Sequence, residues 1–216
     1  SAATQSVAAY QAYTAALADL HRGGQDALAR SVARLREATR IDPSFGQAYI
    51  ALAMTQQTQR RWGYPHDDPA EAVRRARALG TSLPDRDRLL VEGLAALFLD
   101  GDVTTAFARW ARLRQLYPSF ANEAGVPSLI ADTCMAVGDW DRLILDTADA
   151  ADDPSVPVAE RARLSSLLGR AYRKKGEFER AMAHVQRAIE IWPSREGPAV
   201  NTMRTLLGRM YVDLGQ

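Results

Sequence analysis

The side chains of this chain that could carry out chemistry are few and scattered. The sequence contains one cysteine, Cys134, and three histidines, His21, His66 and His184, which lie far apart along it. A single cysteine forms no internal disulfide, and these residues lack the close spacing of zinc ligands. The sequence also has no glycine-rich phosphate loop and no Gly-x-Ser-x-Gly motif. We therefore predict no cofactor, no metal site and no catalytic residue in this chain.

The run His66-Asp67-Asp68 is the group that most resembles a metal or acid–base site. It lies between two prolines, and Asp68 directly precedes Pro69 and an alanine- and glutamate-containing segment. Aspartate is favoured just before a helix, and proline is favoured at the first helical position. We expect Asp68 to cap a helix that spans about residues 70–80.

Charge is the most informative chemical feature of the sequence. The 27 Lys+Arg and 26 Asp+Glu residues give a net charge of +1, which provides no global field for binding nucleic acid. This total hides a segregation, because residues 117–156 hold eight acidic groups and one basic group. Residues 157–216 hold eleven basic and six acidic groups. A partner is therefore expected near the junction of these two blocks.

Several cations of the basic block recur at helical spacing. Arg163, Arg170 and the pair Arg173 and Lys174 are separated by seven and then by three or four residues, which places them on one face of a helix. Arginine can hold a carboxylate through two parallel hydrogen bonds, so this strip could receive an acidic peptide segment or a C-terminal carboxylate. The alternatives are a solvated face and neutralisation by the adjacent acidic block.

Helices must position these side chains, because strand patterns are nearly absent from the sequence. The clearest helix covers residues 178–192, with its apolar residues at Phe178, Ala181, Met182, Val185, Ala188 and Ile189. Glycines and prolines recur with a period: Pro84 and Pro118 are 34 residues apart, and Gly101 and Gly138 are 37 apart. Such a period predicts helix-turn-helix units that bury their apolar faces by stacking on one another.

Residues 165–193 resemble the tetratricopeptide repeat (TPR). The residues that match its pattern are Leu168, Gly169, Tyr172, Gly176, Phe178, Ala181, Ala188 and Pro193. Gly169 and Ala181 are small enough for two helices to approach, and Gly176 permits the turn between them. The resemblance implies an all-α fold, a right-handed TPR superhelix or α-solenoid of antiparallel helix pairs. It also implies a protein-interaction module that binds a peptide or a partner protein in its concave groove.

The other units match this pattern less fully, and they lengthen its turns. We expect one array of about five and a half helix pairs over residues 1–216. Its approximate units are 6–43, 44–84, 85–118, 119–156, 157–193 and 199–216. The last unit has a single helix, which either caps the array or belongs to a truncated repeat. We therefore expect a piece of a larger protein.

The resemblance also implies which residues face the groove. They are Arg163, Arg170, Arg173 and Lys174 in the fifth unit and Arg209 in the sixth. The same offsets in the second and third units predict an apolar groove, whose residues are Ile50, Met54, Val91 and Phe98. That wall would suit an amphipathic helix or a second copy of the chain, and closure of the superhelix would bury it equally well.

The thiol and several aromatic side chains call for a choice between packing against the chain and contact with a partner. Cys134 falls where the repeat places a bulky residue between its helices, so we expect a buried side chain rather than a reactive thiol. Trp110 and Trp140 are expected to pack. Trp62 lies with Tyr64 in a lengthened turn, where it could contact a partner or pack over the end of its own helix pair.

The wider setting rests on composition and on a weaker resemblance. The 25 arginines against two lysines indicate a GC-rich bacterial genome. The lengthened turns resemble degenerate TPR regions of bacterial regulatory proteins, which implies a scaffold or sensory region. The alternative is a regulatory or substrate-peptide-binding domain of a multidomain enzyme, such as a nucleotide cyclase or a Ser/Thr kinase. No signal peptide or membrane span is present in the sequence, so we expect a cytoplasmic location.

The expected partner is a protein or a peptide. The acidic block and the apolar wall argue against a third class, RNA-binding helical repeats, because a basic groove would have to run throughout. We expect no nucleic acid and no membrane insertion, and we leave a homo-oligomer open. The chain itself is expected to have no enzymatic activity, although a catalytic domain could be linked to it.

Overall fold

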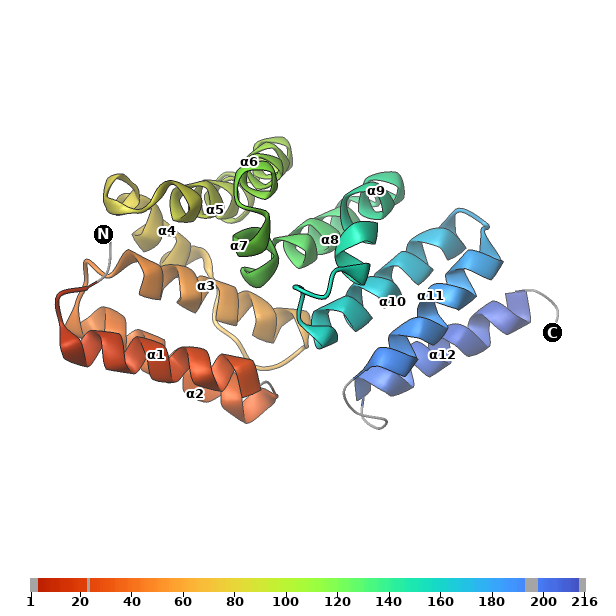
Figure 1. Ribbon diagram of the computed structural model, residues 1–216, viewed down its shortest axis with the longest axis horizontal. Coiled ribbons are helices and arrows are strands. Elements are labelled where there is room, and N and C mark those ends of the chain that lie inside the picture. Colours follow the sequence, from red (N-terminus) through yellow and green to blue (C-terminus); the bar gives the residue numbers. More distant parts are fainter. Residues whose placement is uncertain (1–3, 23, 193–197, 214–216) are drawn as a thin grey trace. The chain divides into compact units, whose positions relative to one another are not determined.

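The computed structural model describes residues 4–22, 24–192 and 198–213. Every regular element in these ranges is a helix and none is a strand, which confirms the predicted all-α fold of stacked helix pairs (Figure 1). None of the helices described is both long enough and apolar enough to cross a membrane. Contacts group the chain into two compact units, residues 1–113 and 114–216.

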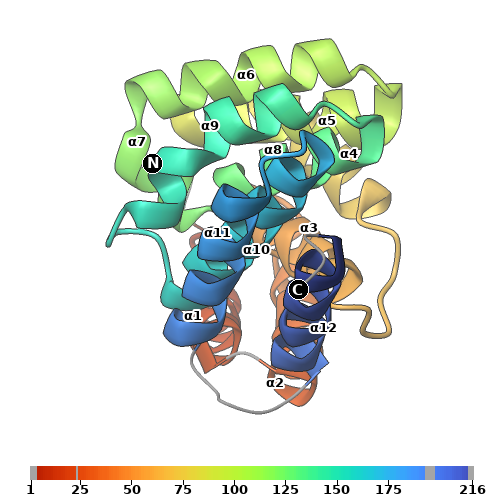
Figure 2. The ribbon, with the colours of Figure 1, turned by 90° about the vertical axis from the view of Figure 1, so that its right-hand side faces the viewer.

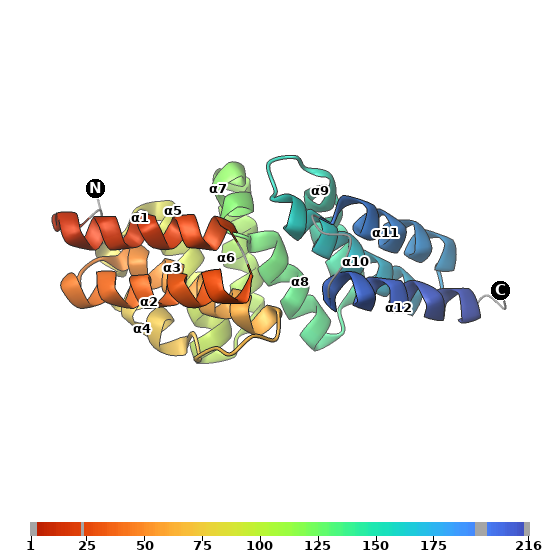
Figure 3. The same cartoon turned by 90° about the horizontal axis from the view of Figure 1, so that it is seen from below.

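The first unit is a series of antiparallel helix pairs. Figures 1 and 3 show its first two helices side by side. The π-helix η2 directly continues α5, and the 3-10 turn η1 follows α4. The elements that begin in this unit are α1 (Val7–Arg22), α2 (Gln25–Ile41), α3 (Gly46–Arg61), α4 (Ala70–Ala78), η1 (Gly80–Ser82), α5 (Asp85–Ala95), η2 (Ala96–Asp100) and α6 (Val103–Leu116).

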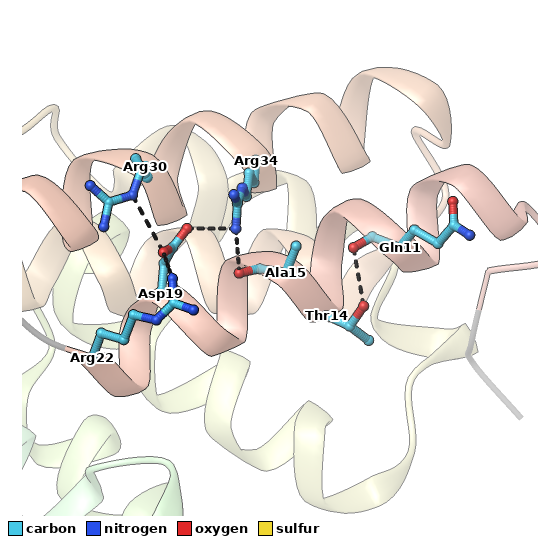
Figure 4. A network of polar contacts seen from close by, with 7 residues as sticks. All are labelled: Gln11, Thr14, Ala15, Asp19, Arg22, Arg30 and Arg34. Atoms are coloured by element: carbon cyan, nitrogen blue, oxygen red, sulfur yellow. Dashed lines mark hydrogen bonds and ion pairs between the residues drawn. The ribbon is translucent and has the colours of Figure 1, made fainter.

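A buried carboxylate joins α1 to α2 (Figure 4). Asp19 of α1 is fully buried, and its oxygens lie 3.4 Å from Arg30 and 2.6 Å from Arg34, both on α2. Arg22 binds the same carboxylate at 3.2 Å. Arg34 also donates to the main-chain carbonyl of Ala15 at 2.9 Å. A buried carboxylate is tolerated only where such donors surround it, so this cluster fixes how the two helices pack.

The turn before α4 confirms the predicted cap. Asp68 accepts a hydrogen bond from the backbone N–H of Ala70 at 2.9 Å, and Pro69 precedes α4 in a helical conformation. Asp67 forms an ion pair with Arg36. The His66 run therefore closes a turn and starts a helix.

The third pair contains a large indole that packs against a glycine. Trp110 of α6 is fully buried, as predicted. A Cβ atom at Gly93 of α5 would lie 2.3 Å from Nε1 of that indole, which no real side chain could accept. Gly93 thus gives this pair the close approach that Gly169 gives the fifth pair.

The second unit contains the helices from α7 onward. The short helix α7 was not predicted, and it comes between α6 and α8 along the sequence. Figure 2 turns the molecule so that α11 and α12 face the viewer. The helices of this unit are α7 (Pro118–Glu123), α8 (Val126–Val137), α9 (Trp140–Asp152), α10 (Val158–Lys174), α11 (Phe178–Ile191) and α12 (Pro198–Asp213).

The pair α10 and α11 packs as the sequence predicts. A Cβ atom at Gly169 would lie 2.4 Å from the Val185 side chain and 2.9 Å from the carbonyl oxygen of Ala181. Gly176 turns the chain with a φ of 77°, a conformation that favours glycine. Pro193, which the sequence places at the end of the second helix, lies outside the described residues.

The helix α12 packs on α11 through a continuous apolar cluster. Met203, Leu206 and Met210 of α12 contact a core that includes Val185 and Ala188 of α11. The residues at these five positions are almost completely buried. This packing fixes α12 against the fifth pair, so that Arg209 has a defined place in the second unit.

Candidate functional site

The second unit contains a groove of about 500 Å³. It is formed by the helices α8, α10 and α12 together with Trp140, the first residue of α9. The first helices of the fourth, fifth and sixth predicted units therefore all contribute to it. Its lining residues are Met135, Trp140, Arg170, Arg173, Lys174, Asn201, Thr202, Thr205, Leu206 and Arg209.

Four of the five predicted cations line this groove. Arg170 and Lys174 are one turn apart on α10, and Arg209 comes from α12. These three form no ion pair with any carboxylate of the described residues. Arg173 differs, because its Nε lies 2.6 Å from a carboxylate oxygen of Asp213. The groove therefore contains three cations without a described counter-charge and one, Arg173, that already forms an ion pair within the chain.

The fifth predicted cation, Arg163, is not part of the groove lining. Its guanidinium forms an ion pair with Asp132 of α8, and its side chain is only 12% exposed. Asp132 belongs to the acidic block, and that block neutralises other cations in the same way. Lys175 pairs with Asp141, and Arg187 pairs with Asp152. Neutralisation by the acidic block, which the sequence left open, holds for these three side chains. Arg170, Lys174 and Arg209 form no such pair among the described residues.

The sequence did not identify the apolar part of the groove. Met135 of α8 and Trp140 of α9 are half-buried and line it. Trp140 was expected to pack, and it does so only in part. Met135 carried no signal of its own, because the fourth unit matches the repeat pattern poorly.

The uncharged polar wall on α12 was also missed, although the sequence contains a signal for it. Asn201, Thr205 and Arg209 recur every four residues, so they form one stripe on α12. The hydroxyl of Thr205 donates to the carbonyl of Asn201 at 2.9 Å and keeps lone pairs that can accept. The stripe thus offers hydrogen-bonding groups beside the cations.

The predicted apolar groove of the first unit contains two buried and two half-buried side chains. Ile50 and Val91 are 7% and 2% exposed, so they belong to the core of that unit. Met54 and Phe98 are half-buried. The burial of Ile50 and Val91 fits the alternative in which the chain covers this wall itself. A docking groove at these four residues remains a prediction.

The lengthened turn of the second pair holds Trp62 and Tyr64, which are both half-buried. The backbone N–H of Tyr64 donates to the carbonyl of Gln59 at 2.9 Å, which folds the turn back onto the end of α3. This placement favours packing over an exposed contact. The two aromatic side chains of this turn are therefore only partly exposed for contact with a partner.

The cysteine of the second unit lies in the core. Cys134 is fully buried, as predicted, and burial raises the pKa of its thiol to about 12. A thiol with that pKa carries almost no thiolate at neutral pH. The described residues also contain no group of three or more His, Cys, Asp or Glu side chains that could hold a metal ion.

A comparison with protein families agrees with the repeat geometry of α10 and α11. A family model for the tetratricopeptide repeat matches residues 164–198. This segment is a TPR-type repeat. The match includes Arg170, Arg173 and Lys174, so three groove cations belong to the repeat itself. Repeats of this type form interaction surfaces for other proteins. No curated protein matches the sequence.

Proposed function

We propose that the chain is a protein-interaction module whose second unit receives an acidic segment of a partner protein in the groove between α8, α10 and α12. The observation that carries this proposal is the convergence of Arg170, Lys174 and Arg209 on one groove without a described counter-charge. Cations held together in this way attract carboxylates, and arginine adds directional hydrogen bonds.

The internal pair between Arg173 and Asp213 supports the same ligand chemistry. Here a carboxylate from another helix reaches the α10 strip and binds it at 2.6 Å. A partner's carboxylate would meet the same type of donor at the neighbouring positions. The larger bacterial regulatory protein that we propose around this module rests on composition and on the weaker resemblance alone.

Selection from a display library of random peptides tests this proposal with a defined probe. We expect peptides rich in Asp and Glu to be enriched on the wild-type chain. The triple variant Arg170→Glu, Lys174→Glu and Arg209→Glu should weaken their binding by about tenfold or more, because attraction becomes repulsion.

A matched control keeps the change in total charge the same. The variant Lys175→Glu, Arg180→Glu and Arg204→Glu changes three exposed cations of the second unit that do not line the groove. Its binding should stay close to that of the wild type at physiological salt, where distant charges are screened. The proposal is wrong if no acidic peptide is enriched, or if both variants weaken binding equally.

A further inference from the structure

The arrangement of charge and apolar surface in the groove specifies more than an acidic ligand. We infer that the groove binds an extended segment in which two acidic residues are separated by one apolar residue. This inference rests on the proposed function, since it describes the ligand of the same groove. It follows from the size of the groove, from the spacing of its cations and from the place of its apolar side chains.

The volume of the groove suits a ligand of a few residues. A helix is about 10 Å wide with its side chains, so about 500 Å³ would hold only about one helical turn. An extended segment of a few residues fits the same volume and reaches α8, α10 and α12.

The spacing of the cations on α10 matches alternate residues of an extended chain. Arg170 and Lys174 stand at positions i and i+4, whose Cβ atoms lie about 5–6 Å apart on a helix. In an extended chain, residues i and i+2 point to the same side and are about 6.6 Å apart. Two acidic residues at i and i+2 can therefore face Arg170 and Lys174 together, whereas adjacent acidic residues point to opposite sides.

The groove also offers apolar surface to the aliphatic residue of the ligand. Met135 and Trp140 supply apolar surface from α8 and the start of α9, and both are only half-buried. Covering that surface with an aliphatic side chain removes it from water, which favours binding. Arg209, on α12, remains available to a carboxylate or a backbone carbonyl of the ligand.

Fluorescence anisotropy with two labelled peptides of equal composition tests the inference. The first peptide is Gly-Ser-Glu-Leu-Glu-Ser-Gly, and the second is Gly-Ser-Leu-Glu-Glu-Ser-Gly. The alternating peptide should bind about tenfold more tightly, because the second peptide loses one charge-assisted contact. Replacing its leucine by serine should weaken binding in the wild type and have little effect in Trp140→Ala.

A neighbouring pair of lysines provides the matched control. Lys174→Gln should reduce the preference for the alternating peptide, while Lys175→Gln should not, because Lys175 lies outside the groove and pairs with Asp141. Both side chains are exposed, so neither change should disturb folding. Equal binding of the two peptides would overturn the inference and leave the proposed function standing. Failure of every acidic peptide to bind would overturn both.

Discussion

At the residue scale, His184 couples the fold of the second unit to pH. Its ring stacks on Tyr172 with the ring centres 5.2 Å apart, and Arg180 lies over the tyrosine ring. Burial lowers the pKa of His184 below the ordinary value of about 6.5, and the charge of Arg187 lowers this pKa further. Asp152, on α9, acts in the opposite direction. The protein therefore stabilises the neutral imidazole.

The sign of the pH dependence follows from this depressed pKa. Between the pKa of the folded state and about 6.5, the unfolded chain binds the proton more readily than the folded chain. The contribution of His184 to stability is then fully present above about pH 6.5 and is lost as the pH falls below it. We expect thermal melts to show a lower melting temperature at pH 5 than at pH 7, and His184→Gln to reduce that difference.

The exposed His66 supplies the control for this measurement. His66→Gln should leave the difference between pH 5 and pH 7 unchanged, because that side chain is exposed. If His184→Gln keeps the full pH dependence of the wild type, other groups carry it and the role assigned to His184 is wrong.

At the element scale, the close approach of α10 and α11 depends on Gly169. A methyl group there would meet the Val185 side chain and the backbone oxygen of Ala181, which cannot move without shifting α11. We expect Gly169→Ala to lower the free energy of unfolding by about 1–3 kcal/mol through overpacking, despite the better helix propensity of alanine. Urea denaturation measures this change.

Gly208 on α12 is the matched position, because a Cβ atom there meets nothing within 4 Å. Gly208→Ala should raise the free energy of unfolding by about 0.5–1 kcal/mol, since alanine favours the helix. Two substitutions of the same kind should thus have opposite signs. A stabilising effect at both glycines would contradict the packing described for α10 and α11.

The sequence predicted the elements well because their determinants are local. The spacing of apolar residues defined α11. Gly176 marked the turn before it, because the preference of a positive φ for glycine depends only on the local backbone. The cap at Asp68 was predictable for the same reason. The short helix α7 was missed, because no regular repeat contains it.

The candidate site was predictable only where its residues follow the repeat. Arg170, Lys174 and Arg209 sit at repeat offsets, and they line the groove. Arg163 sits at such an offset as well, but its partner Asp132 lies 31 residues earlier on another helix. Tertiary contacts of that kind leave no pattern in a single sequence. The burial of Ile50 has the same origin.

At the scale of the whole molecule, the net charge of +1 conceals how the charges are distributed. Acids of α8 and α9 pair with Arg163, Lys175 and Arg187, so much of the charge segregation is resolved inside the second unit. Arg170, Lys174 and Arg209, which form no ion pair among the described residues, line the groove. An acidic ligand would therefore bind to the cations that the chain itself does not neutralise.

The four tryptophans allow the place of peptide binding to be measured directly, since the indole N–H of each gives a resolved signal in a ¹H–¹⁵N NMR spectrum. Trp140 lines the groove, whereas Trp62 lies in the turn after α3 and Trp110 is buried in the first unit. Trp140→Phe assigns the decisive signal. On titration with Gly-Ser-Glu-Leu-Glu-Ser-Gly, we predict a saturable shift of the Trp140 indole, with Trp62 and Trp110 unmoved. A shift at Trp62 with none at Trp140, or no shift at any indole, would contradict the assignment of the groove as the binding site.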